Sequence, residues 1–328
     1  MTSPRQWKAR TILALLLAAA LCLNAELQSL HPIAARIESS LLDTAPTSFI
    51  ESLSRSFAYY LWMTSKAFVL PALIIAFTYF LETWLSEAQR EPKNQLMATL
   101  VQLSFFYLAY LGAHFVSALV PMPSGSLLRL PQHPWGITTL LVAIGTGAIF
   151  LVAYDFLLYW THRAHHYVPF LWKFHAVHHS TRDLDALHNY THPVEQVVRY
   201  LVVGVPLNLL LQLDEQEFYL ILTFLSVQTQ LSHMNAPLHF GILGNVLVDN
   251  RHHFVHHSSE PRHFNRNYAL IFSFTDRIFG TYCRPGPTLP KTGFDKEEIP
   301  STMAGFILAR KVRPQSTVPK YRSSNRFI

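Results

Sequence analysis

Long apolar runs recur through the first two thirds of the chain. Residues 57–82, 96–120 and 137–160 are each long enough to cross a bilayer, which takes roughly 20 helical residues. A further pair, 197–213 and 217–231, is separated by the acidic segment DEQE and predicts a helical hairpin. The pattern predicts an all-α fold, a multi-pass transmembrane helical bundle.

The N-terminus is compatible with two structures. Basic residues at Arg5, Lys8 and Arg10 precede the apolar run TILALLLAAALCL. This order is typical of a cleaved signal peptide, and also of a first membrane helix that extends to about residue 30. We favour the membrane helix. In both cases the basic residues indicate the cytoplasmic side.

Counting spans from a cytoplasmic N-terminus places the residues after Trp160 on the cytoplasmic face. The hairpin at 197–231 then returns the chain to the same face. We therefore expect a cytoplasmic, histidine-rich helical cap, at the inner membrane of a bacterium or the endoplasmic reticulum of a eukaryote. The basic residues that favour this orientation are Arg163, Lys173, Arg182, Arg251, Arg262, Arg266 and Arg277.

Composition supports the membrane interpretation and divides the chain into three regions. Half of the residues are hydrophobic and 14% are charged, whereas soluble domains carry about 25% charged residues. We expect an N-terminal transmembrane region over 1–136, a histidine-rich domain over 137–290 and a poorly ordered basic tail over 291–328. The net charge of +6 lies largely in that tail, which we expect to contact anionic lipid headgroups and not nucleic acid.

Histidine is concentrated in a short part of the chain. All but three of the 18 histidines lie between His162 and His263, and three motifs stand out: HRAHH, HAVHH and HFVHH. Residues three and four apart share one face of a helix, so each motif can direct two or three imidazoles at one point. The predicted metal ligands are His162, His166, His175, His178, His179, His253, His256 and His257, with His233 as a ninth.

So many ligands exceed the needs of one metal ion. A structural zinc site is complete with four ligands, so nine imidazoles predict two ions with four or five nitrogens each. No HExxH motif occurs, and Cys22 and Cys283 form no CxxC pair, which excludes the common zinc-peptidase and iron–sulfur arrangements. The donor set suits oxygen-activating iron better than hydrolytic zinc, although the residues alone do not decide between them.

The remaining histidines are expected to have lesser roles. We interpret His31, His114 and His133 as interfacial polar residues, and His165 and His252 as supporting or solvated neighbours of the ligands. His192 is expected to bind or support a metal, and this is less expected for His188, which lies four residues earlier.

Asp155 lies seven residues before His162 on the same helical face, close to the membrane boundary. An acid is costly there and is usually functional or paired. We expect it to accept the second N–H of a ligating histidine, or else to pair with Arg163. Asp249 and Asp276 are weaker candidates for the same supporting role.

Six segments occur in an order that resembles the fatty acid hydroxylase/sterol desaturase superfamily. They cover about residues 138–285 and read DFLLYWTHRAHH, LWKFHAVHHS, THPVE, LSHMN, HFVHHS and NYALIFSFTDRIFGTY. The resemblance implies an integral membrane enzyme with a non-haem di-iron centre, ligated by the eight histidines of the three motifs. It also implies that His233 is a further ligand and that Asn235, in the same LSHMN segment, supports the site.

The chain departs from the superfamily pattern at several positions. Asn250 or Arg251 replaces a frequent proline, and Phe254 replaces an arginine. Ala269 and Thr275 also differ from the late NYG…WDR pattern. None of these positions is a predicted metal ligand, but the differences prevent assignment to one subfamily.

The resemblance implies oxidation of a lipid drawn from the bilayer, with dioxygen as co-substrate and two iron ions as cofactor. We predict hydroxylation of a C–H bond in a fatty acyl, sterol or related lipid, with desaturation as the alternative. QHPWG and GTG lack the context of a cytochrome or dinucleotide site, so electrons are expected from a separate ferredoxin, cytochrome or reductase. A non-enzymatic metal transporter or sensor is a distant alternative, since its ligands should lie within membrane spans; dizinc hydrolysis is another.

Overall fold

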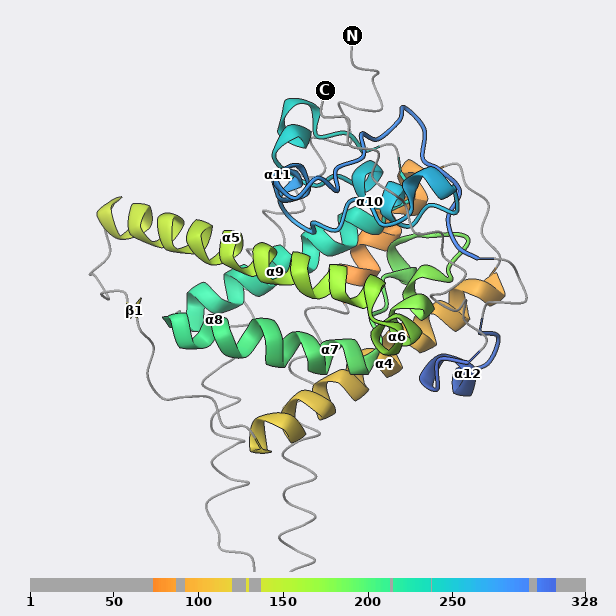
Figure 1. Cartoon of the computed structure of the whole chain (residues 1–328), viewed down its shortest axis with the longest axis horizontal. Coiled ribbons are helices and arrows are strands. Elements are labelled where there is room, and N and C mark those ends of the chain that lie inside the picture. The colour runs from red at the N-terminus through yellow and green to blue at the C-terminus, as the bar shows by residue number, and fades with distance from the viewer. Residues whose placement is uncertain are drawn as a thin grey trace, which may run out of the picture.

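The computed structural model describes residues 73–86, 92–119, 128–129, 137–212, 215–236, 238–294 and 300–310. Helices make up almost all of the regular structure in these ranges, which confirms the predicted all-α class (Figure 1). Strands β1 and β2 have two residues each and pair in parallel. After a helical segment at 73–85, the elements are α4 (Pro92–Leu119), β1 (Leu128–Arg129), α5 (Ile137–Tyr167), α6 (Pro169–His179), η1 (Ala186–His188), α7 (Pro193–Arg199), η2 (Tyr200–Gly204), α8 (Val205–Leu210), β2 (Leu211–Gln212), α9 (Glu215–His233), η3 (Gly241–Asn245), α10 (Asn250–His256), η4 (Pro261–His263), α11 (Ser273–Ile278) and α12 (Met303–Ile307).

The predicted helical hairpin is present. One arm runs through α7, η2 and α8, and the other is α9. Val203 and Leu207 of the first arm pack with Ile221 and Leu225 of the second, and Phe150 of α5 joins the same buried cluster. Helix α5 therefore lies against both arms, as Figure 1 shows. This arrangement brings the ends of α5 and α9 that carry histidines to one side of the bundle.

The first arm contains a π-helical turn, η2, between Tyr200 and Gly204. Pro206, two residues after the end of this turn, has no N–H to donate to the carbonyl four residues earlier, where its ring would also clash. Proline thus accounts for the local change in helical pitch, which lets the chain continue as α8 without a break. The distorted turn begins immediately after Arg199, the last residue of α7.

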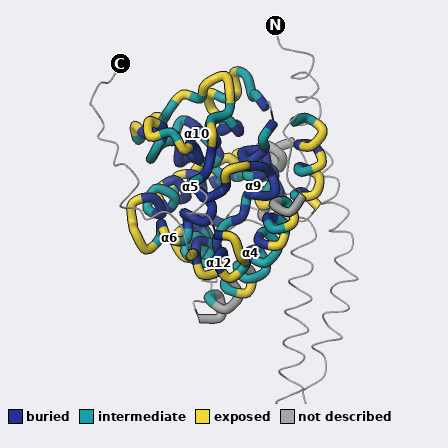
Figure 2. The backbone as a smooth tube through the Cα atoms, turned by 90° about the vertical axis from the view of Figure 1, so that its right-hand side faces the viewer, coloured by how far each residue is buried: buried dark blue, intermediate teal, exposed yellow. Residues whose placement is uncertain are grey.

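Two further buried clusters fix the remaining helices around this bundle. Helix α4 packs through Val101 and Phe105 against Val177 of α6 and Phe306 of α12. The segment 73–85 packs through its own apolar residues against α9 and the loop that follows it. Figure 2 shows the buried stretches concentrated near α5, α9 and α10, where the histidine motifs lie.

In the ranges that the structure describes, no helix combines the length and the apolar character needed to cross a membrane. Helices α4 and α5 coincide with the expected spans at 96–120 and 137–160. The expected first membrane helix, most of the span at 57–82 and the basic end of the tail lie outside the described residues. The multi-pass arrangement therefore stays a prediction.

Asp155 holds α5 to the segment before α11. Its buried carboxylate accepts the backbone N–H groups of Leu270, Ile271 and Phe272 at 3.1, 2.9 and 3.3 Å, and the hydroxyl of Thr275 at 3.0 Å. The sequence predicted that Asp155 would pair with a ligating histidine or with Arg163, and both predictions are wrong. The physical reason is that three consecutive buried N–H groups need an acceptor, and this carboxylate supplies it.

We expect Asp155→Ala to lower the free energy of unfolding by at least about 3 kcal/mol, because several buried donors lose their acceptor. Asp155→Asn should cost less, since one carbonyl oxygen remains to accept. Denaturant unfolding of the purified variants measures this. An unchanged unfolding midpoint together with lost metal would instead favour the role in supporting a metal ligand.

Candidate metal centre

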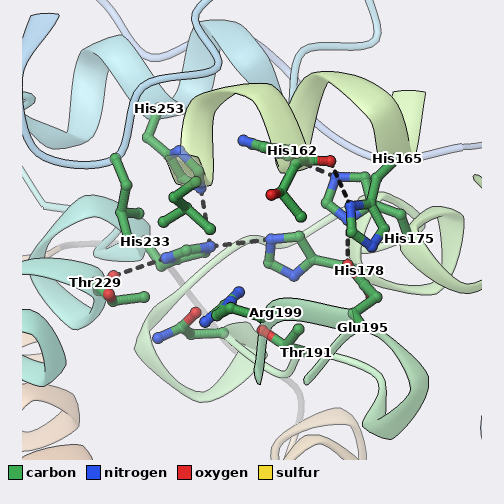
Figure 3. Close-up of a pocket in the computed structure, with 14 residues that line it drawn as sticks. His162, His165, His175, His178, Thr191, Glu195, Arg199, Thr229, His233 and His253 are labelled. Carbon is green, nitrogen blue, oxygen red and sulfur yellow. Dashed lines mark hydrogen bonds and ion pairs between the residues drawn. The ribbon is translucent and has the colours of Figure 1, made fainter. Parts of the chain in front are cut away.

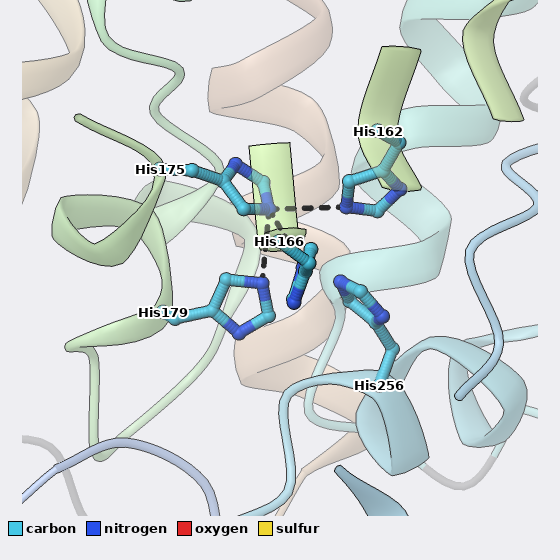
Figure 4. A group of neighbouring side chains, drawn as sticks. All are labelled: His162, His166, His175, His179 and His256. Carbon is cyan, nitrogen blue, oxygen red and sulfur yellow. Dashed lines mark hydrogen bonds between the residues drawn. The ribbon is translucent and has the colours of Figure 1, made fainter. Parts of the chain in front are cut away.

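The structure brings all nine predicted ligand histidines together in two groups. The ligand atoms within each group lie within 4.8 Å of one another. The first group, drawn in Figure 4, is His162, His166, His175, His179 and His256. The second is His178, His233, His253 and His257. The groups have five and four imidazoles, in agreement with the four or five nitrogens expected for each of two ions.

Helices α5, α6, α9 and α10 supply these side chains, and their histidine-bearing ends meet at one place. His162 and His166 lie one helical turn apart near the end of α5, and Pro169 then starts α6 after a short connection. Proline is well suited to a first helical turn, where its missing N–H has no partner to lose. Helix α6 consequently folds back on α5, so its histidines face those of α5.

The two later motifs are each divided between the groups. His175 and His179 of α6 belong to the first group, while His178 between them belongs to the second. In the third motif, His256 joins the first group, and His253 and His257 join the second. Sharing these helices keeps the groups adjacent: the rings of His179 and His257 stack with centroids 4.3 Å apart.

The tautomers of three histidines follow from their hydrogen bonds. The Nδ1–H groups of His162, His233 and His256 donate to the backbone carbonyls of Tyr268, Thr229 and Arg266, at 2.8, 2.7 and 2.8 Å. A carbonyl oxygen only accepts, so the proton must lie on Nδ1. Burial lowers the pKa of all three rings, which keeps them neutral. Each Nε2 therefore carries a bare lone pair directed into its group.

The spacing of these Nε2 atoms fits metal coordination. In the first group, Nε2 of His175 lies 3.1 Å from the Nε2 atoms of His162, His166 and His179. In the second, Nε2 of His233 lies 3.0 Å from that of His253. Lone pairs that face one another repel unless a cation lies between them. Two imidazoles bound at about 2.1 Å and at right angles place their nitrogens about 3.0 Å apart, so each donor set fits one metal ion.

Glu195 is a functional candidate that the sequence interpretation missed. Its buried carboxylate lies 2.6 Å from Nδ1 of His175, through Oε2, and its other oxygen accepts the backbone N–H of His192 at 3.2 Å. A carboxylate that accepts from the second nitrogen of a ligand fixes the ring and raises its basicity. Burial raises the pKa of Glu195 to about 8, and the positive charge of Arg199 opposes this. Its signal in the sequence was its place in THPVE, two residues after the proline that begins α7.

We expect Glu195→Gln to weaken metal binding by about 10- to 100-fold, the usual effect of losing such a partner. The amide is neutral, and its single oxygen cannot accept from both His175 and His192. Metal titration of the apoprotein measures the affinity. Asp185→Asn is the matched control, because Asp185 pairs at 2.8 Å with His188, which belongs to neither group. Equal losses in both variants would contradict a specific role for Glu195.

The other candidates have structural partners. His192 caps α7: its Nδ1 accepts the N–H of Val194 at 3.2 Å and its Nε2–H donates to the carbonyl of Ile307 at 3.0 Å. His188 pairs with Asp185, and His165 donates from Nδ1 to the carbonyl of Thr161 at 2.7 Å. None of these three is in either group.

Two buried acids also act on the backbone near the site. Asp276 accepts from Nε2 of His252 at 3.0 Å, and Asp249 caps α10, so neither of them contacts a ligand through the hydrogen bonds found.

Asn235 donates its backbone N–H to Glu82 at 2.6 Å. Glu82 is fully buried and also accepts from the N–H of Ala186 at 2.9 Å. This second missed carboxylate ties together the segments that follow α6 and α9.

Comparison with known families decides the identity of this region. Residues 147–281 match the family model described as fatty acid hydroxylase. These residues thus match a fatty acid hydroxylase domain. The predicted membership of the fatty acid hydroxylase/sterol desaturase superfamily is thereby confirmed, and all nine histidines of the two groups lie inside the matched residues.

Relatives of the fatty acid hydroxylase domain have names of lipid-oxidising enzymes. An alkylglycerol monooxygenase of Danio rerio is 27% identical over 200 residues, which cover 61% of this chain and 40% of the relative. The Delta(7)-sterol 5(6)-desaturase erg3B of Aspergillus fumigatus is 28% identical over 46% of this chain and 42% of the relative. The ornithine lipid hydroxylase OlsE of Rhizobium tropici is 28% identical over 51% of this chain and 49% of the relative.

The chain thus spans less than half the length of each of these relatives. Their names support the expected enzyme class, an oxidoreductase. No solved structure matches the chain.

A cavity of about 60 Å³ adjoins both histidine groups of the fatty acid hydroxylase domain (Figure 3). One part of its lining is apolar, with Leu158 and Leu270, and another is polar, with Asn189, Thr191 and Arg199. The histidines that line it are His162, His165, His175, His178, His233 and His253.

Proposed function

We propose that this protein is a membrane-bound di-iron oxygenase that hydroxylates a C–H bond of a lipid. The observation that carries the proposal is the pair of buried imidazole groups inside a fatty acid hydroxylase domain. All-nitrogen sites of this kind suit iron, and they lack the thiolates and carboxylates that favour other metals. The names of the relatives support a lipid as the substrate.

Two bound irons would supply oxygen activation: one atom of dioxygen enters the C–H bond, and the other leaves as water, with two electrons and two protons from an external donor. The first group of histidines would hold one ion and the second the other. The chain itself orients these ligands through Glu195 and through backbone carbonyls. Burial of the rings excludes water from the reacting carbon.

Contact with the bilayer is supported by a stripe of exposed apolar residues on α5. Ile149, Val152, Phe156 and Trp160 are each at least 43% exposed, and their spacing of three and four residues places them on one helical face. A contiguous apolar surface of this kind marks a site of contact with a membrane or another protein. We propose that it faces lipid, with the histidine groups on the cytoplasmic side of a multi-pass protein.

Comparative lipidomics of cells with and without the protein tests the proposed function. Hydroxylation adds one oxygen atom to a lipid, whereas desaturation, the activity in the name of the sterol desaturase relative, removes two hydrogen atoms. Growth under labelled dioxygen should place the label in the new hydroxyl group. Purified protein should contain about two irons per chain, and a preparation that holds only zinc and oxidises no lipid would contradict the proposal.

A further inference from the structure

Arg199 is a cation that lines the cavity beside the two histidine groups. It ends α7 and is half-buried, and its side chain lines the cavity next to the histidine groups (Figure 3). Within the described part of the chain, its guanidinium makes no hydrogen bond or ion pair. The positive charge of Arg199 acts at a distance on Glu195, four residues earlier, and opposes the rise in the pKa of that carboxyl group. Glu195 uses its two oxygens for His175 and His192.

The charge is not needed to balance the histidines. Burial lowers the pKa of every histidine ring that lines the cavity, because it disfavours the charged form. These rings therefore remain neutral. The positive charge of Arg199 disfavours protonation of the histidine rings further. A guanidinium has five N–H donors, and those of Arg199 make no hydrogen bond to the residues that the structure describes. Its planar fork is suited to carboxylate and phosphate oxygens.

The lining divides into two parts that match the two ends of an amphipathic ligand. In Figure 3, Arg199 and Thr191 lie on the opposite side of His178 from His162, and Asn189 adds an amide to the polar part. Leu158 and Leu270 supply the apolar part. Because Arg199 lines the same cavity as histidines of both groups, a group bound by Arg199 lies near a carbon presented to those histidines.

We propose that Arg199 determines substrate specificity by binding an anionic oxygen group, carboxylate or phosphate, of the lipid close to the carbon that is oxidised. The proposal rests on the proposed function and narrows its substrate class to lipids whose reacting carbon lies near an anionic group. Bound metal ions would also attract anions, so an anion preference alone does not identify Arg199. Substitution of Arg199 does.

Equilibrium binding to the purified, metal-loaded full chain under anaerobic conditions tests the proposal without turnover. The probes are octanoate, octyl phosphate and 1-octanol, which share one chain and differ in the head. The wild type should bind at least one of the two anions more tightly than the alcohol. Arg199→Gln should weaken binding of that anion by about tenfold or more, as expected for one lost hydrogen bond to a charged group, and leave 1-octanol unchanged. Arg199→Lys should restore part of the difference.

Arg262→Gln is the matched control, because Arg262 is 73% exposed, pairs with Glu260 and does not line the cavity. It should bind all three probes like the wild type. Inorganic phosphate should bind much more weakly than octyl phosphate, since it cannot use the apolar lining; equal binding would overturn the assignment to a lipid. Equal affinity of the wild type for all three octyl probes, or an equal loss for all three in Arg199→Gln, would overturn the proposal even if the protein oxidises lipids.

Discussion

Replacing His179 with alanine should reduce the metal content from about two ions per chain to about one, and lipid oxidation by at least about 100-fold. His179 is one of five imidazoles in the first group, and its Nε2 lies 3.1 Å from that of His175. His257→Ala should have the same effect through the second group, which has only four imidazoles. Metal analysis and product formation measure the two consequences separately.

His165→Ala is the matched control for these variants. His165 belongs to the same sequence motif as His162 and His166 and is as buried as His179, but its Nδ1–H donates to its own helix and it is in neither group. We expect this variant to retain both metal ions. Loss of metal from His165→Ala, or full metal content with normal turnover in His179→Ala, would show that the groups are not the ligand sets.

The gathering of the candidate ligand histidines was predictable because their spacing reflects helical geometry. His162 and His166, or His253 and His257, can reach one point only if they lie on one face of a helix, and the structure has helices at both places. The hairpin was predictable for a similar reason: two apolar runs interrupted by DEQE must turn there. Local periodicity was sufficient in both cases.

The division of the motifs between the two groups was not predictable in this way. His178 and His179 are neighbours in the sequence but point into different groups, because adjacent residues on a helix diverge by about 100°. Which group each one joins depends on where α9 and α10 approach α6, and this is a property of tertiary packing. No periodicity within one motif contains that information.

The supporting acids were harder still to predict. Asp155 has the right spacing to reach His162, yet it binds the backbone at Leu270, more than a hundred residues away in the sequence. Glu195 acts on His175 from another helix. Buried carboxylates pair with whichever donors the fold leaves unsatisfied, so their partners follow from the assembled chain and not from local spacing.

Acidification should unfold the metal-free protein in the range where histidine titrates. Burial lowers the pKa of His233 from 6.5 to about 4 and that of His256 to about 3, and the other ligand histidines shift in the same direction. Below about pH 6.5, the unfolded chain therefore binds protons that the folded chain does not, and the free energy of unfolding decreases as the pH is lowered. For His233 alone the loss between these values is on the order of 3 kcal/mol.

Several such losses together exceed the 5–15 kcal/mol by which folded domains are usually stable. Glu195 acts in the opposite direction, because its raised pKa lets the folded state bind one extra proton from about pH 8 downwards, but one carboxyl group cannot offset nine histidines. Bound metal should move the acid transition to lower pH, since protons must displace the ions before the rings can be charged. Thermal unfolding from about pH 8 to about pH 5, with and without chelator, measures both effects.

A single substitution tests whether the histidine groups cause this transition. In metal-free protein, His256→Gln should reduce the dependence of the free energy of unfolding on pH by about 1.4 kcal/mol per pH unit, the contribution of one proton. His239→Gln is the control, because His239 belongs to neither group and its Nδ1 accepts the backbone N–H of Gly241. Stability that stays constant or rises as the pH falls would contradict neutral, buried histidines. The same slope in wild type and His256→Gln would place the titrating groups elsewhere.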